Sequence, residues 1–303
     1  VQLATVLLLS VGFLLWLERR AQSRMRFAPN SSARSNSLEA RPLQLRGWRA
    51  GLLNALCALP VLLGFVLPVA MMLRPFLQGL ESDQAVPWAQ FGHWALNSVQ
   101  LAGLAAVLAV ALALALASLA RLRPGRLVQS LLQITGLGYA VPGAVIVVGL
   151  LIPLGELQMW QPEWGVAAWV TTTIVGIVWA YLVRFTAVAL QSVQSGYARI
   201  PQSHDDAART LGTHGLRLFK TVHLPLLRRP VLVAVLLVFV DIMKELPATL
   251  VLRPFNYDTL AVVAYQLARD ERLSEAALPS LALVLVGLIP VILISRSLRS
   301  EQA

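Results

Sequence analysis

Apolar residues along this 303-residue chain gather into long blocks that short polar segments separate. An α-helix needs about 20 consecutive apolar residues to cross the hydrocarbon core of a bilayer. Seven blocks approach that length, so the pattern predicts an all-α, polytopic helical membrane protein with about seven transmembrane helices. The expected spans are residues 3–17, 51–73, 95–119, 128–152, 166–190, 231–252 and 278–295.

Two of these spans contain residues that interrupt helices. The fourth span holds Pro142 with Gly136, Gly138 and Gly143, and the sixth holds Pro247. Irregular backbone at membrane depth is tolerated only where neighbouring helices or a cavity satisfy the freed polar groups. We therefore expect these positions either to line a pathway or to kink a packed helix.

The composition agrees with a membrane protein, with 57% hydrophobic and 13% charged residues and a mean hydropathy of +0.69. A soluble chain of this length needs far more polar surface. The net charge of +10 does not indicate nucleic-acid binding, because no basic face interleaved with aromatic residues is present in the sequence. The single cysteine, Cys57, lies in an apolar block and predicts a buried hydrophobic residue.

The basic residues fix an expected orientation. Residues 18–49 carry eight arginines, residues 191–229 carry five arginines and Lys220, and a third basic loop holds Arg121, Arg123 and Arg126. By the positive-inside rule these segments are cytoplasmic. Alternation through seven spans then places the N-terminus outside and the C-terminus in the cytoplasm.

The segment between the first and second spans divides the chain. Residues 18–49 are rich in Arg, Ser and Asn and lack sustained periodicity, which is typical of a linker. The expected organisation is a leading transmembrane helix at 1–17, a basic cytoplasmic linker at 18–49 and a six-helix transmembrane domain at 50–303.

The cytoplasmic segment 201–225 predicts a helix–turn–helix elbow. Ser203 and Asp206 have the spacing of a capping box, so a short helix is expected to begin there. Gly212 is able to adopt a positive φ and end that helix. Ala207 and Ala208 would leave part of the helix flat enough for another protein to approach closely.

A second short helix is expected from about Thr213. It would end before Pro225, which begins the connection to the sixth span. Its expected apolar face consists of Leu216, Phe219 and Val222. From these residues alone, an amphipathic connector resting on its own helix bundle stays an alternative to a docking element.

The spacing within this loop resembles the EAA loop of ABC importer permeases. The shared pattern is an acid followed by two alanines, a glycine four residues later, and an aliphatic residue two positions before Leu-Pro. The matching residues are Asp206, Ala207, Ala208, Gly212, Val222, Leu224 and Pro225. The sequence departs from the family pattern at Asp206, where glutamate is usual.

The resemblance covers residues from about 50 to 300, which look like one six-span half of a type I importer permease. Segments 241–249, 253–259 and 270–279 resemble the iron(III) branch of that family. Proteins of that branch commonly carry two fused halves, each with its own loop, whereas a single loop is found here. The chain is thus expected to be the C-terminal half of a tandem permease, with 1–17 as the last helix of the first half.

The resemblance implies a transport subunit and not an enzyme. It implies a cytoplasmic ABC ATPase dimer docked on the loop, a periplasmic substrate-binding protein and a second permease half. The sequence lacks the Gly-x-x-x-x-Gly-Lys-Ser/Thr phosphate loop, so ATP and Mg²⁺ are expected on the ATPase and no cofactor on this chain. The implied cargo is ferric iron. Sulfate, thiamine, polyamine or phosphonate stay open, as does an ion-gradient-driven secondary transporter.

Charged residues in the sixth span are candidates for the translocation pathway, because intramembrane charges usually face a cavity or one another. Asp241 and Lys244 have the spacing of an ion pair, with Glu245 and Pro247 beside them. The alternative is a structural pair that locks two helices. Arg184 is expected to extend to the membrane interface.

The coupling loop also holds His204, His214 and His223. They lie about ten residues apart and no cysteine is near them, so no metal site is expected.

Overall fold

The computed structural model describes residue 17 and residues 47–81 and 88–300, with side chains up to 293 and none at 80 and 81. The chain divides into two units, residues 1–77 and 78–303. In the first unit, α2 (Trp48–Val61) continues through the π-helical turn η1 (Leu62–Val66) into α3 (Leu67–Glu81). This apolar stretch, Trp48–Gly79, is long enough to cross a membrane.

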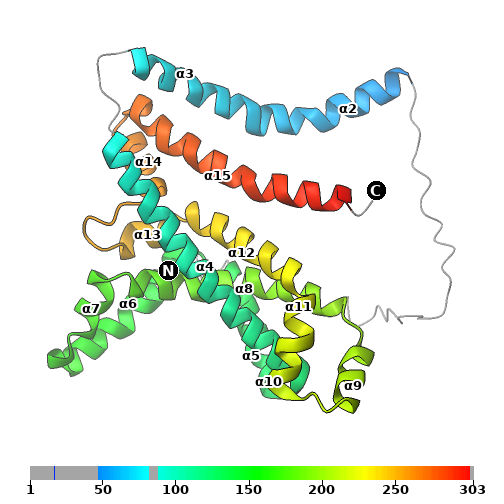
Figure 1. Cartoon of the computed structure of the whole chain (residues 1–303). Helices are drawn as coiled ribbons and strands as arrows, with labels where there is room; N and C mark the ends of the chain where they lie inside the picture. The colour runs from blue at the N-terminus through cyan, green and yellow to red at the C-terminus, as the bar shows by residue number, and fades with distance from the viewer. Residues whose placement is uncertain (1–16, 18–46, 82–87, 301–303) are drawn as a thin grey trace. The chain divides into compact units, whose positions relative to one another are not determined.

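Within the described residues the second unit consists of helices and connecting turns (Figure 1). Its elements are α4 (Trp88–Leu122), α5 (Arg126–Leu137), η2 (Gly138–Ala140), α6 (Gly143–Trp160), η3 (Pro162–Trp164), α7 (Val166–Thr172), α8 (Val175–Ala198), α9 (Gln202–Thr210), α10 (Gly215–Leu218), η4 (Phe219–His223), α11 (Leu224–Leu226), α12 (Arg228–Met243), α13 (Pro247–Leu252), α14 (Leu260–Arg269) and α15 (Leu273–Ser300).

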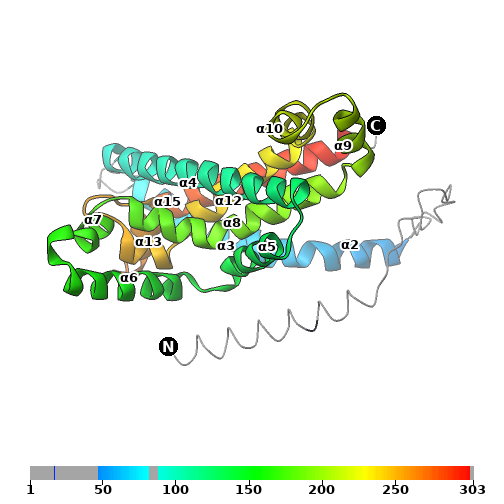
Figure 2. The same ribbon diagram turned by 90° about the horizontal axis from the view of Figure 1, so that it is seen from below.

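The core of the second unit is the mutual packing of α4, α8 and α12 (Figures 1 and 2). The buried face of α4 is a stripe of small residues three or four positions apart, which includes Ala102, Ala105, Ala109 and Ala113. Small side chains let helix backbones approach closely, and in lipid this close packing is a main source of helix association. The small residues of α4 therefore make it the central helix of the second unit, packed against α8 and α12.

The predicted all-α membrane fold is confirmed. Five described helices are long and apolar enough to span a bilayer, namely Trp48–Gly79, Trp88–Leu122, Gly143–Trp160, Val175–Ala198 and Leu273–Leu293. They include the predicted spans 51–73 and 95–119 and most of 278–295. The leading span and most of the predicted linker lie outside the described residues.

The spans predicted at 128–152, 166–190 and 231–252 are each interrupted, as the glycine and proline residues predicted for the first and the third but not for the second. The first divides into α5, η2 and α6, the second into α7 and α8, and the third into α12 and α13. Pro142 and Pro247 begin new helical segments because proline lacks the N–H that a helix interior requires. The interruptions leave short helical segments whose ends lie against α8.

The break after α5 brings the backbone of η2 against α8. A Cβ atom built at Gly138 would lie 2.0 Å from the carbonyl oxygen of Val183, which no side chain tolerates. Gly136, two residues earlier, has open space at the same position among the described residues. The glycine at 138 is therefore a packing requirement of the break, whereas Gly136 is not.

We predict that Gly138→Ala lowers the stability of the folded protein by about 2 kcal/mol or more, because the added methyl group forces η2 away from α8. Gly136→Ala is the matched control and should be neutral or stabilising by up to about 1 kcal/mol, since alanine favours a helix. Thermal unfolding in detergent measures both. Equal stability of the two variants would contradict the close approach.

Candidate functional site

The first helix of the elbow, α9, begins at Gln202, with its N-cap two residues before the predicted cap at Ser203. Pro201 is its N-cap, and the described side chains supply no capping hydrogen bond. The predicted capping box of Ser203 and Asp206 is therefore wrong. Asp206 instead lies on the exposed side of α9, with Arg209 as an ion-pair partner at 3.5 Å.

The prediction that Gly212 adopts a positive φ and ends the first helix is confirmed. Its φ is +78°, and the N–H groups of Gly212 and Thr213 donate to the carbonyls of Arg209 and Ala208 at 3.0 and 2.9 Å. These two bonds form a Schellman motif, which ends a helix and satisfies its last carbonyl groups. Ala208 is buried, whereas Ala207 is exposed.

The second arm of the elbow differs from its prediction. α10 starts at Gly215, because His214 is extended and Gly215 has a φ of +55°. The helix does not stop before Pro225, because the π-helical turn η4 leads directly into α11 with Pro225 in its first turn. Pro225 has no N–H, so the backbone hydrogen bonding to the preceding turn is interrupted at this residue.

The two inward residues of this arm are five positions apart, which is the spacing of a π-helical turn. Leu218 and His223 are fully buried, whereas Leu216 of the predicted apolar face is exposed. Phe219 and Val222 are only partly buried. The predicted face of Leu216, Phe219 and Val222 is therefore not the buried one.

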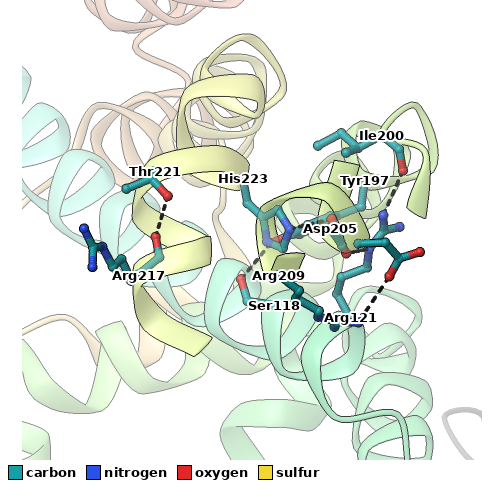
Figure 3. Close-up of polar contacts among 10 residues, drawn as sticks. Ser118, Arg121, Tyr197, Ile200, Asp205, Arg209, Arg217, Thr221 and His223 are labelled. Carbon is teal, nitrogen blue, oxygen red and sulfur yellow. Dashed lines mark hydrogen bonds and ion pairs between the residues drawn. The ribbon is translucent and has the colours of Figure 1, made fainter. Parts of the chain in front are cut away.

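The elbow is held to the helix bundle by the carboxylate of Asp205, the residue before the predicted acid (Figure 3). Its Oδ2 accepts a hydrogen bond from Nε of Arg121 on α4 at 2.8 Å, and its Oδ1 lies 3.1 Å from Nε2 of His223 in η4. Arg121 also donates to the carbonyl of Ile200 at 2.9 Å. Asp205 is 3% exposed and His223 0%, so these are interior contacts.

The same network extends to α8 through Tyr197. Its hydroxyl lies 2.9 Å from Oγ of Ser118 on α4 and 3.3 Å from Nδ1 of His223, and its ring packs edge-on against the imidazole. We call Ser118, Arg121, Tyr197, Asp205 and His223 the loop clamp. The clamp joins α4, the end of α8, α9 and η4 at one buried point (Figure 3).

The hydrogen bonds of the clamp affect the ionisation of Asp205. Burial by itself raises the pKa of a carboxyl group. The hydrogen bonds from Arg121 and His223, with their charges, outweigh burial and lower the pKa of Asp205 below its ordinary value. The carboxylate is therefore ionised at neutral pH and only accepts hydrogen bonds, so Nε2 of His223 donates to it.

The clamp leaves the outer side of the elbow uncovered by the described residues. Leu211 and Leu216 are 85% and 67% exposed, and Asp206, Ala207 and Gly212 are also exposed. An apolar groove of about 490 Å³ lies between α4 and the second arm, lined in part by Leu114, Leu119, Phe219 and the exposed Leu216. The elbow thus has a fixed point at the clamp and open space beside it.

The predicted charges of the sixth span are placed at the break between α12 and α13. Lys244 pairs with Asp241 at 2.8 Å as predicted, and its side chain is 63% exposed. Pro247 is exposed and begins α13. Since a lysine facing lipid at membrane depth is costly, the exposed side of this break is suited to a polar passage or a partner helix.

Glu245 is buried and turns towards α8, where Nη1 of Arg184 lies 3.6 Å from Oε1. The same oxygen accepts the N–H of Ala248 at 3.3 Å, a free donor at the start of α13. The guanidinium of Arg184 lies over the rings of Tyr139 and Phe185. The prediction that Arg184 extends to the membrane interface is therefore wrong, because Glu245 and these rings hold it inside the bundle.

Five functional candidates were missed by sequence reasoning, namely Ser118, Arg121, Arg184, Tyr197 and Asp205. Only Asp205 had a local signal in the sequence, as an acid next to the motif.

For metal binding, the described residues hold no group of three or more His, Cys, Asp or Glu side chains placed to hold an ion.

The chain also matches a known family of membrane proteins. Residues 108–300, more than half of the chain, match the family of binding-protein-dependent transport system inner membrane components. The chain belongs to that family. The resemblance predicted from the loop is thereby confirmed, and the matched region contains both the clamp and the charged break.

Two curated proteins show which members of this family are similar. The chain is 27% identical over 238 residues to the Fe(3+)-transport system permease protein FbpB 2 of Haemophilus influenzae, covering 78% of this chain and 45% of that protein. It is 27% identical over 159 residues to PhnV of Salmonella typhimurium, a permease protein named for 2-aminoethylphosphonate transport, covering 52% and 56%. The chain spans about half the length of these relatives.

Solved structures support the family fold. A bacterial alginate ABC transporter, solved in complex with an alginate pentasaccharide-bound periplasmic protein, aligns with a TM-score of 0.61 at 16% identity. The alignment covers 81% of this chain and 92% of that one. A second alginate importer structure aligns with a TM-score of 0.58 at 13% identity. At these identities the likeness concerns the fold alone.

The clamp predicts different outcomes for two adjacent acids of this family member. Asp205→Asn removes the charge that assists two hydrogen bonds and replaces one acceptor oxygen by an NH2 donor, so it should lower the free energy of unfolding by about 2 kcal/mol. Asp206→Asn, the matched control, breaks only an exposed pair and should change it by at most about 0.5 kcal/mol. Thermal unfolding in detergent near neutral pH measures both.

The effect should also depend on pH with a definite sign. Because the pKa of Asp205 is lowered on folding, its stabilisation is complete above the unfolded value of about 3.9 and is lost as pH falls through the folded value. The wild-type protein and Asp205→Asn should therefore converge in acid. A difference that grows with falling pH would contradict this assignment.

Proposed function

We propose that this chain is the transmembrane permease subunit of an ATP-driven ABC importer and that residues 201–225 couple it to a cytoplasmic ATPase. The observation that carries the proposal is the clamped elbow. Asp205 fixes it to α4 and η4 through buried contacts, while Leu211, Gly212 and Leu216 face outward. A docking element must be rigid on one side and free on the other to transmit a displacement.

The length of α4 supports an arrangement in which the elbow and the loop after α13 lie on opposite membrane faces. Ser118 belongs to the clamp, and Ser98, 20 residues earlier on α4, accepts the N–H of Leu260 at 2.8 Å. At 1.5 Å per residue the two serines are about 30 Å apart, the thickness of a bilayer core. Because the basic elbow is proposed to be cytoplasmic, residues 253–259 are proposed to lie on the external side of the membrane.

The proposed assembly therefore has partners on both sides. An ATPase dimer that binds ATP and Mg²⁺ docks on the elbow, and an external substrate-binding protein delivers cargo near residues 253–259. There, Arg253 pairs with Asp258, and Asn97 donates to the carbonyl of Asp258 at 3.1 Å, so the loop is held in a fixed shape. A second permease half completes the pathway in the inner membrane.

We propose ferric iron as the cargo. The support is the extent of similarity, since the Fe(3+)-transport relative aligns over 238 residues and the phosphonate relative over 159 at the same identity. Phosphonate import is the second candidate for that reason. Competition for uptake of labelled ferric iron by 2-aminoethylphosphonate, in cells expressing the complete importer, separates the two. Uptake of labelled phosphonate without iron uptake would overturn the iron assignment.

Gly212 offers a direct test of coupling. A Cβ atom there meets nothing within 4 Å among the described residues, so substitution acts only through its positive φ. Gly212→Val is expected to distort the elbow and lower ATP-dependent uptake by at least about tenfold, because β-branched residues strongly disfavour this conformation. Gly212→Asn, the matched control, tolerates a positive φ and should retain most uptake.

The measurement is uptake and ATP hydrolysis by the importer assembled with its ATPase and binding protein in liposomes. Hydrolysis in Gly212→Val should persist without matching uptake. Full ATP-dependent uptake in that variant would exclude a coupling role for the elbow.

A further inference from the structure

Two interruptions of the helical backbone converge on one level of α8. The break at 138–142 places Gly138 against the carbonyl of Val183, and the break at 244–246 places Glu245 beside Arg184. Gly143, the first residue of α6, lies between them, since a Cβ atom there would be 2.5 Å from Oε1 of Glu245 and 2.8 Å from Nη1 of Arg184. Three separate segments therefore meet at a single ion pair.

This ion pair is incompletely bonded. At 3.6 Å the separation of Arg184 and Glu245 is longer than a hydrogen bond, and Nε of Arg184 is buried with no partner among the described residues. A buried pair that serves stability alone is expected to satisfy its donors and acceptors, because burial of unpaired charge is costly. The arrangement is instead suited to a contact that opens during a working cycle.

A continuous helix connects the ion pair to the loop clamp. Arg184 and Tyr197 are 13 residues apart on α8, which runs without proline from Val175 to Ala198. This separation corresponds to about 20 Å along a rigid rod. Tyr197 belongs to the clamp, so a displacement of the elbow moves α8 and with it Arg184.

We propose that Arg184 and Glu245 form the gate of the translocation pathway at membrane depth, closed against Gly143. Displacement of the elbow by the ATPase draws α8 away from the α12–α13 break and separates the two charges. Opening exposes both side chains to the passage, where Lys244 is already exposed. This inference rests on the proposed function, since it requires an ATPase that moves the elbow.

The gate predicts a gain of function as well as a loss. Glu245→Gln and Arg184→Gln weaken the closed state, so ATP hydrolysis without binding protein should rise at least about fivefold, while cargo imported per ATP falls. Arg272→Gln, which breaks an exposed ion pair with Glu275 at the start of α15, is the control for loss of charge and should leave the basal rate unchanged. The assay uses the complete importer in liposomes, with and without its binding protein.

Gly143→Ala tests the same gate without a change of charge. Its methyl group separates Arg184 from Glu245 and should raise the basal hydrolysis rate in the same way. Gly149→Ala on the same helix has open space among the described residues and serves as its control. A merely structural role would lower assembly and activity together and would not raise hydrolysis.

The outcomes separate this inference from the proposed function. Assembled variants that keep wild-type basal hydrolysis and wild-type uptake per ATP overturn the gate, as does loss of assembly in all three variants without any rise in hydrolysis. A wild-type chain that binds no ATPase and imports no cargo overturns the proposed function and the gate with it. Raised basal hydrolysis in all three variants, with both controls unchanged, supports the gate.

Discussion

The Asp205 carboxylate accepts from Arg121 and lies against His223 at the same time, and this double contact determines what the cytoplasmic elbow is able to do. A nine-residue helix such as α9 is marginal in isolation, because helix nucleation is unfavourable. Its persistence as a fixed element therefore depends on tertiary contacts. The buried clamp supplies them and links the elbow to α4 and, through Tyr197, to α8.

The small residues of α4 and the interruptions in the other spans have complementary roles. The small residues of α4 let α4, α8 and α12 pack closely against one another. The segments that are broken, at 138–142 and 244–246, carry irregular backbone to membrane depth beside α8. A stiff helix between a clamped loop and a loosely bonded ion pair is a simple means to transmit a movement through the bilayer. In the proposed function, α8 has that role.

Sequence reasoning recovered the features that depend on local chemistry. The lengths of the apolar blocks predicted a helical membrane protein. Gly212 was predicted to end the first helix of the elbow because glycine readily adopts a positive φ. It failed where long-range packing decided the outcome. Nothing local pairs Arg121 with Asp205, 84 residues later, or Arg184 with Glu245, so the clamp went unseen and Arg184 was assigned to the interface. The inward residues Leu218 and His223 are five positions apart, the spacing of the π-helical turn η4, which regular helical periodicity does not anticipate. Orientation and cargo stay predictions.

The central claim is that the elbow is one rigid body with the transmembrane core before any ATPase binds. Amide hydrogen exchange of residues 202–210 in the isolated permease measures this directly. If opening of the clamp costs about 3 kcal/mol, these amides exchange about 100-fold more slowly than in an unstructured peptide. The same protection should extend to the end of α8 at Tyr197. Exchange of α9 at the rate of an unstructured peptide, beside a protected α8, would contradict the account.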